Sequence, residues 1–138
     1  MGGGILVDTS VWIQFFNGVE SPQAEYLRQS VQDDQPLFLC PTIIQEVLQG
    51  IRSDKDYENV KDSLLAFPVP NWNPMEAAIA AAQLYRGLRK KGITIRKSND
   101  CLIAAFAQRF DMAILHSDRD FSIMAEQRII RVVSFRTP

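Results

Sequence analysis

The chain has 138 residues, of which 46% are hydrophobic and 22% charged, and it carries a formal net charge of -1 with a pI near 5.8. These values predict one soluble domain with its own core over residues 1–138, with residues 1–4 set aside as a flexible or non-native end. The charge disfavours a broad, indiscriminate nucleic-acid surface, although a local basic patch is compatible with it. Neither a membrane span nor a secretion signal is present, so we expect a cytoplasmic protein.

Short apolar runs alternate along the chain with longer stretches whose apolar residues recur at helical spacing. Strands that alternate with helices form parallel sheets, so the sequence predicts an α/β fold. In chain order we expect a strand at 5–7, helices over 9–17 and 21–31, a strand at 36–40, helices over 41–51, 54–66, 74–90 and 98–107, and strands at 112–115 and 129–134.

Residues of several kinds are expected in the core. Cys40 and Cys101 lie in apolar segments without a Cys or His partner at zinc-ligand spacing, which predicts buried free thiols in a reducing compartment. Trp12 and Phe15 share the apolar stripe of the first helix. Trp72 stands among asparagines, and we expect it in the core or at an interface, with exposure for base stacking as the alternative.

Four acidic residues accompany the predicted elements at separate points of the chain. They are Asp8 in LVDTS, Glu46 in IQEVLQG, Asp100 in NDCLIAA and Asp118 in HSDRDF. Strand carboxyl ends and helix amino ends face one edge of an open parallel sheet, so these side chains can meet there. Gathered carboxylates repel one another unless cations hold them together. Oxygen ligands without a His or Cys cluster favour Mg²⁺ or Mn²⁺, which serve phosphoryl transfer.

Each carboxylate also has a structural explanation. Asp8 can cap a helix, and Asp100 can be a first-turn acid that the helix dipole favours. Glu46 can be a solvated helix residue. Asp118 and Asp120 can shape a turn. Only the four acids taken together favour a metal site over these alternatives.

Four segments in order, VDTSVWIQFF, IIQEVLQG, SNDCLIAAFA and ILHSDRDF, resemble the motifs of PIN-domain ribonucleases, specifically the VapC toxins of toxin–antitoxin pairs. The resemblance spans nearly the whole chain. It implies that the metal-holding acids are Asp8, Glu46, Asp100 and Asp118. Residues that would support them are Ser10, Asp120, His116 and Ser117. Asp120 ranks below Asp118 as a ligand, and His116 is interpreted as structural rather than catalytic.

The same resemblance implies a three-layer α/β/α sandwich around a small, mainly parallel sheet. It implies endonucleolytic cleavage of RNA, with tRNA among the candidate substrates, using one or two Mg²⁺ or Mn²⁺ ions. We expect Asp8, Asp100 and Asp118 to hold the metal and Glu46 to bind or orient the attacking water. Homodimers and inhibition by a small antitoxin are further implications.

Residues 86–97, RGLRKKGITIRK, contain basic residues and no acid. Cations suit a helix carboxyl end, which explains part of this segment without RNA. The segment also leads directly to Asp100, so it is a candidate for binding phosphates beside the acidic pocket. The residues that would do so are Arg89, Lys90, Lys91, Arg96 and Lys97.

Two other functions fit parts of the pattern. A catalytically silent binding module would retain the PIN-like fold and pair with a partner. An aspartyl-phosphate phosphohydrolase of the haloacid dehalogenase type also begins with a strand-end Asp, but it requires a second Asp two residues later, where this chain has Ser10. Metal-dependent RNA cleavage separates the three possibilities.

Overall fold

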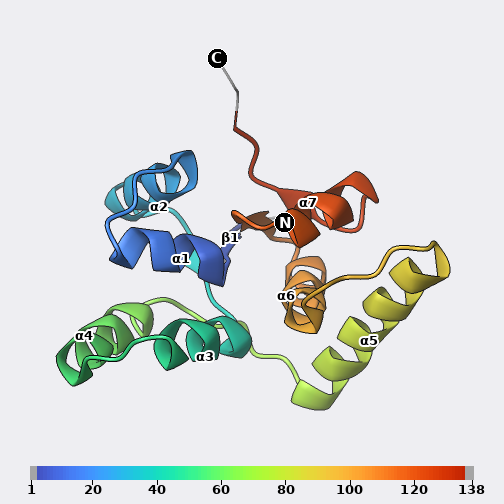
Figure 1. The fold of residues 1–138 in the computed structure, drawn as a ribbon, viewed down its shortest axis with the longest axis horizontal. Helices are drawn as coiled ribbons and strands as arrows, with labels where there is room; N and C mark the ends of the chain where they lie inside the picture. Colours follow the sequence, from blue (N-terminus) through green and yellow to red (C-terminus); the bar gives the residue numbers. More distant parts are fainter. Residues whose placement is uncertain (1–2, 136–138) are drawn as a thin grey trace.

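The computed structural model describes residues 3–135 and has a small parallel sheet at its centre (Figure 1). Its four strands follow the order β2-β1-β3-β4. Their bounds are Ile5–Val7 for β1, Leu37–Phe38 for β2, Ala113–Leu115 for β3 and Arg131–Val132 for β4. The register pairs Leu6 with Phe38 on one side and with Ile114 on the other. The carboxyl ends of β1 and β3 are therefore adjacent.

Helices flank the sheet on both sides, which confirms the predicted three-layer α/β/α architecture. Their bounds are Thr9–Phe16 (α1), Pro22–Gln32 (α2), Pro41–Gln49 (α3), Asp54–Leu64 (α4), Pro74–Lys90 (α5), Ser98–Arg109 (α6) and Arg119–Glu126 (α7). Over residues 3–135, none of these helices combines the length and apolarity needed to cross a membrane.

Side-chain caps fix where most of these helices begin. Ser21 Oγ accepts a hydrogen bond from the Ala24 N–H at 2.9 Å, and Asn73 Oδ1 accepts one from the Met75 N–H at 2.9 Å. A proline occupies the first turn of α2, α3 and α5, where its missing N–H costs nothing. Gly18 and Gly92 follow α1 and α5 with positive φ of 66° and 80°, a conformation that ends helices. Local sequence therefore sets these bounds.

The core includes the strands and buried side chains from all seven helices, and α6 is the most deeply buried helix. Seven residues of α6 are buried, from Asp100 and Cys101 through Ala107, as its apolar composition predicted. Cys40 and Cys101 are buried free thiols. Trp12 is 1% exposed, and the half-buried Trp72 packs edge-on against Phe106, with ring centroids 5.1 Å apart. Trp72 is thus a packing residue rather than an exposed stacking platform.

Three features differ from the sequence predictions. Strand β1 has the predicted bounds, but β2, β3 and β4 are shorter than expected. At the end of β2, the N–H of Leu39 leaves the sheet and bonds to the carbonyl of Pro68 at 3.0 Å. Helix α7 was not predicted, because the acids that begin it also suit a turn. Residues 1–2 lie outside the described part, but Gly4 continues β1, and its carbonyl accepts a hydrogen bond from Ala113 at 3.2 Å.

Candidate metal centre

Asp8 lies at the carboxyl end of β1 and caps α1. The residue is 3% exposed, and its Oδ2 accepts hydrogen bonds from the Ser10 N–H at 3.1 Å and from Ser10 Oγ at 2.6 Å. The backbone N–H of Asp8 donates to the carbonyl of Leu115, the last residue of β3, at 2.9 Å. Asp8 thus caps α1 as expected, and the same carboxylate lies at the edge shared with β3.

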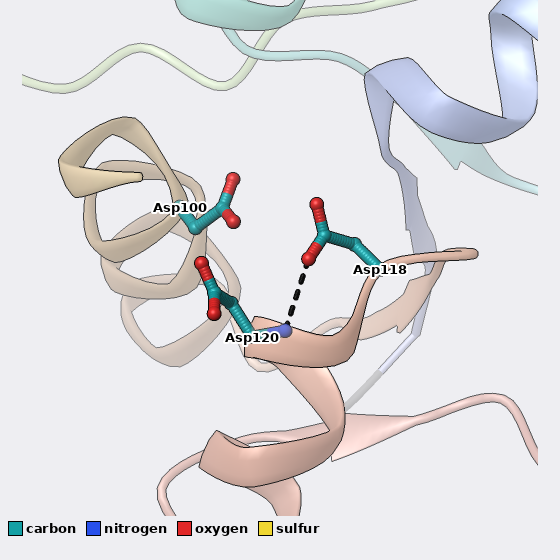
Figure 2. A group of neighbouring side chains, drawn as sticks. All are labelled: Asp100, Asp118 and Asp120. Carbon is teal, nitrogen blue, oxygen red and sulfur yellow. Dashed lines mark hydrogen bonds between the residues drawn. The ribbon is translucent and has the colours of Figure 1, made fainter. Parts of the chain in front are cut away.

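Three other carboxylates converge on the same edge from α6 and α7. Asp100, Asp118 and Asp120 each offer an oxygen, and these oxygens all lie within 4.8 Å of one another (Figure 2). Asp100 is in the first turn of α6, Asp118 caps α7, and Asp120 is in the first turn of α7. Asp100 and Asp120 are 3% and 4% exposed. We call Asp8 and these three residues the acidic pocket.

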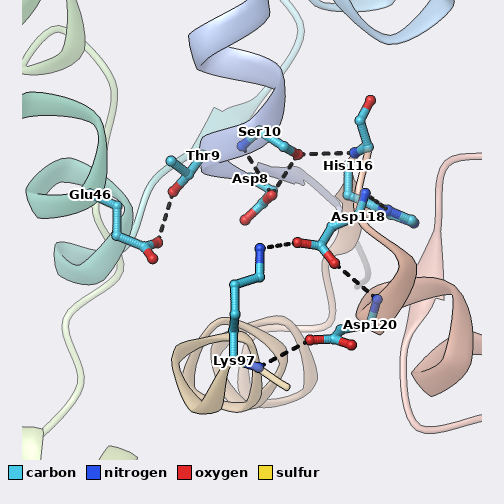
Figure 3. A network of polar contacts seen from close by, with 9 residues as sticks. Asp8, Thr9, Ser10, Glu46, Lys97, His116, Asp118 and Asp120 are labelled. Atoms are coloured by element: carbon cyan, nitrogen blue, oxygen red, sulfur yellow. Dashed lines mark hydrogen bonds and ion pairs between the residues drawn. The ribbon is translucent and has the colours of Figure 1, made fainter. Parts of the chain in front are cut away.

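Asp118 and Asp120 occupy different positions in this pocket. Asp118 Oδ1 accepts a hydrogen bond from the Asp120 N–H at 2.9 Å, and its Oδ2 forms an ion pair with Lys97 Nζ (Figure 3). Asp120 Oδ2 accepts from the backbone N–H of Lys97 at 3.2 Å. Both acids belong to the group that contains Asp100. Asp118, which the sequence prediction ranked first, and Asp120 are therefore neighbouring candidate ligands.

Burial and mutual repulsion shape the electrostatics of the pocket. Burial, together with the nearby charges of Asp118 and Asp8, raises the pKa of Asp100 to about 8. Burial also raises the pKa of Asp8, although its bonds to Ser10 and Thr9 oppose the shift. For Asp118 burial acts in the same direction, but Lys97 and the Asp120 N–H outweigh it and lower the pKa.

Glu46 lies outside the group of three converging aspartates. It is half-buried on α3, and its Oε1 accepts a hydrogen bond from Thr9 Oγ1 at 2.9 Å. Figure 3 shows Glu46 on the opposite side of Asp8 from Asp118. Glu46 thus lies beside the acidic pocket and is connected to it by the hydrogen bond from Thr9, in the first turn of α1. The sequence did not indicate this contact.

Ser10 and His116 have supporting positions. Besides bonding to Asp8, Ser10 Oγ accepts a hydrogen bond from the Ser117 N–H at 3.0 Å. His116 Nδ1 accepts from the Asp118 N–H at 3.1 Å, and its ring lies 5.3 Å from that of Phe121. Burial lowers the pKa of His116, so the imidazole is neutral at pH 7. These contacts support the structural interpretation of His116.

The basic segment 86–97 divides into two parts. Arg89, Lys90 and Lys91 end α5, at the edge of the molecule in Figure 1, while the chain returns from there to α6 beside the sheet. Arg96 is exposed next to the pocket, where its charge helps to lower the pKa of Asp118, after the effects of burial and Lys97. Lys97 alone in this segment forms an ion pair with a pocket acid in residues 3–135. Sequence reasoning placed Lys97 among RNA-binding residues and missed this contact.

Comparison with known proteins agrees with this geometry. Residues 5–127 match the family model of the PIN domain. The chain is 34% identical over 133 residues to the VapC ribonuclease Mb1587 of Mycobacterium bovis, an alignment that covers 96% of this chain and 99% of that protein. Ribonuclease VapC11 of Mycobacterium tuberculosis is also 34% identical, with the same coverage.

Solved structures show the same fold at lower identity. VapBC2 from Rickettsia felis, bound to a DNA fragment from its promoter, superposes with a TM-score of 0.73 at 13% identity, covering 94% of this chain and 97% of that one. VapBC-1 from nontypeable Haemophilus influenzae gives a TM-score of 0.70 at 16% identity, with 94% and 96% covered. FitAcB from Neisseria gonorrhoeae gives 0.69 at 18% identity, also with 94% and 96% covered. At these identities the likeness concerns the fold.

Proposed function

The chain belongs to the PIN-domain family and is related to VapC ribonucleases over nearly its whole length, and we propose that it is the endoribonuclease toxin of a toxin–antitoxin pair. The proposal includes dependence on Mg²⁺ or Mn²⁺. The observation that carries it is the convergence of Asp100, Asp118 and Asp120 within 4.8 Å, beside Asp8 at the end of β1. Such a group of carboxylates is suited to hold a cation against a phosphodiester.

The residues of the acidic pocket fit a divalent cation. Asp100 Oδ2 is buried and has no hydrogen-bond partner among the described residues, although buried carboxylate oxygens normally have one. A cation would satisfy this oxygen and offset the repulsion from Asp118 and Asp8 that helps raise the Asp100 pKa. The donors are all oxygens, which Mg²⁺ and Mn²⁺ prefer. When bound, such an ion supplies Lewis acidity that neutralises phosphate charge and makes water a stronger acid.

In this proposal the protein residues have distinct roles. Asp8, Asp100 and Asp118 hold the ion, and Ser10 fixes the Asp8 carboxylate through two hydrogen bonds. Glu46, oriented by the Thr9 hydroxyl, binds the attacking water and directs it at phosphorus. Because water itself is the nucleophile and attacks in line with the leaving oxygen, whose bond to phosphorus breaks in the same displacement, no covalent enzyme intermediate forms.

We also propose a small antitoxin as the partner and a homodimer as the assembly. Similar folds occur in the VapBC complexes of Rickettsia felis and Haemophilus influenzae, which supports an antitoxin for this chain. Met75 and Ile79 lie one turn apart on α5 and are 74% and 59% exposed. This apolar pair offers contact area to either partner.

The decisive experiment incubates the purified protein with total RNA and with tRNA in Mg²⁺, Mn²⁺ or EDTA. We expect cleavage with either ion, none in EDTA, and none with Asp100→Asn, which keeps the side-chain shape but removes a charge. Asp34→Asn is the matched control, because Asp34 is an exposed residue just after α2 and outside the pocket. It should cleave as the wild type does.

Two outcomes would contradict the proposal. Cleavage that survives EDTA or Asp100→Asn would exclude the metal mechanism. A folded protein that arrests no growth when expressed without an antitoxin, and that cuts none of the RNAs, would identify a silent binding module. The growth assay covers the case of a single cellular target, since it exposes the protein to every RNA of the host.

A further inference from the structure

Lys97 connects the two sides of the acidic pocket. Its backbone N–H donates to Asp120 Oδ2 at 3.2 Å, and its Nζ forms an ion pair with Asp118 Oδ2 (Figure 3). Lys97 is also the N-cap residue of α6, the helix that carries Asp100 in its first turn. Lys97 therefore stands at the start of α6 and binds both acids at the start of α7.

The oxygens of the pocket differ in what they already bind. Both oxygens of Asp118 have protein partners, namely the Asp120 N–H and the Lys97 ammonium. Asp100 Oδ2 is buried with none among the described residues, and Asp8 uses only Oδ2 in its bonds to Ser10. Among the described residues, the buried oxygen that lacks a partner therefore belongs to Asp100, within the group that also contains Asp118 and Asp120.

Within the described residues, Lys97 is the one Lys or Arg that forms an ion pair with an acid of the pocket. The other ion pairs of residues 3–135 join Arg28 to Glu25, Lys61 to Glu58 and Arg131 to Asp111, all outside the pocket. The Asp118 side chain is 6% exposed, whereas that of Lys97 is 48% exposed. The lysine thus reaches in from the solvent side and places its compact charge on a nearly buried carboxylate.

We propose that Lys97 supplies the second positive charge of the acidic pocket, so that Asp8, Asp100 and Asp118 hold one divalent ion while the ammonium stays on Asp118 Oδ2. Two-ion phosphodiesterases use a second cation to neutralise carboxylate and phosphate charge. Here the lysine would serve that purpose without a second ion. The inference rests on the proposed function, because it concerns the same pocket.

The test counts bound ions by titrating Mn²⁺ and following the EPR signal of the free ion. We expect one ion per chain for the wild type and for Lys97→Arg, which keeps the charge. Lys97→Met and Lys97→Gln should bind a second ion at least about tenfold more tightly than any second-site binding in the wild type, because a repelling charge is gone. Lys91→Met is the matched control from the same basic segment and should bind one ion.

Cleavage gives a second readout. The rate should depend on the first power of Mn²⁺ concentration in the wild type and on nearly the second power in Lys97→Met. Circular dichroism confirms that each variant is folded. Two ions in the wild type, or one ion with unchanged affinity in both neutral variants, would overturn the inference and leave the proposed function intact. A wild type that binds no ion would overturn the proposed function itself.

Discussion

The Ser10 hydroxyl accepts a hydrogen bond from the Ser117 N–H at 3.0 Å, joining the starts of the segments that follow β1 and β3 across 107 residues of chain. The same hydroxyl donates to Asp8 at 2.6 Å. One small side chain thus aligns the two strand ends that carry Asp8 and Asp118. This explains in physical terms why a hydroxyl residue stands two positions after Asp8.

Ser10→Ala should therefore lower both stability and activity. Losing a part-buried hydroxyl that makes two interactions is expected to reduce the free energy of unfolding by about 1–2 kcal/mol, measured by urea denaturation. Ser10→Thr keeps the hydroxyl and should restore most of the loss. Ser63→Ala is the control, because the exposed Ser63 hydroxyl donates only to its own helix, at Asn59. Equal losses for Ser10→Ala and Ser63→Ala would contradict this interpretation.

The pKa of Asp100 predicts an unusual pH dependence for the metal-free protein. Burial and neighbouring acids raise this pKa to about 8 in the folded state, against about 3.9 in an unfolded chain. Between these values the unfolded state has lost a proton that the folded state keeps, so stability falls as pH rises. In EDTA, Tm should be at least about 5 °C lower at pH 8 than at pH 5.5.

Two controls belong to this measurement. Asp100→Asn should weaken the dependence between pH 5.5 and pH 8, since its titrating group is absent and only the raised pKa of Asp8 still acts in the same direction, while Asp34→Asn should preserve it. The lowered pKa of Asp118 has the opposite sign, and its stabilisation is lost only as pH falls below about 4, outside this window. Saturating Mg²⁺ should raise Tm more at pH 8 than at pH 5.5. A Tm in EDTA that rises from pH 5.5 to pH 8 would contradict a raised pKa for Asp100.

Asp118 has a capping role and a charge role that substitutions can separate. Its Oδ1 caps α7 through the Asp120 N–H, while its Oδ2 faces Lys97 and the pocket. Asn caps helices about as well as Asp, so Asp118→Asn should keep the cap and lower the free energy of unfolding by about 1 kcal/mol or less, through loss of the ion pair with the half-exposed Lys97. It should nevertheless reduce cleavage by about 100-fold or more, because a pocket charge is lost.

Asp118→Ala removes the cap as well and should cost about 1 kcal/mol of stability in addition to the activity. Thermal and urea unfolding measure the first effect, and RNA cleavage under single-turnover conditions measures the second. If Asp118→Asn retained full cleavage while Asp120→Asn abolished it, the pocket charge that matters would belong to Asp120. The sequence alone could not decide which of these two acids is the ligand, because they stand two residues apart in one short segment.

The sequence predicted those features that depend on local chemistry. Pro41 and Pro74 marked helix starts, and the strand-end position of Asp8 placed it at the pocket because parallel strands share an edge. Features that depend on distant contacts were missed. Lys97 is one of several cations in its segment, and only folding brings it to Asp118, 21 residues away. The sequence located β2 but extended it to 36–40, because a strand of two residues leaves almost no periodic signal that would mark its ends.

Thr9 orients Glu46, one of the four acids that the sequence predicted for the metal site. Its hydroxyl donates to Glu46 Oε1 at 2.9 Å and is the contact that ties this half-buried carboxylate of α3 to the first turn of α1. Thr9→Val keeps the shape of the side chain but removes the donor, which should reduce cleavage by about tenfold through a poorly oriented water. Thr9→Ser should retain cleavage. Mn²⁺ affinity should change little in either variant, because Glu46 lies outside the group of aspartates that converge on the ion site. A Thr9→Val protein that lost Mn²⁺ binding in proportion to cleavage would instead make Glu46 a direct ligand.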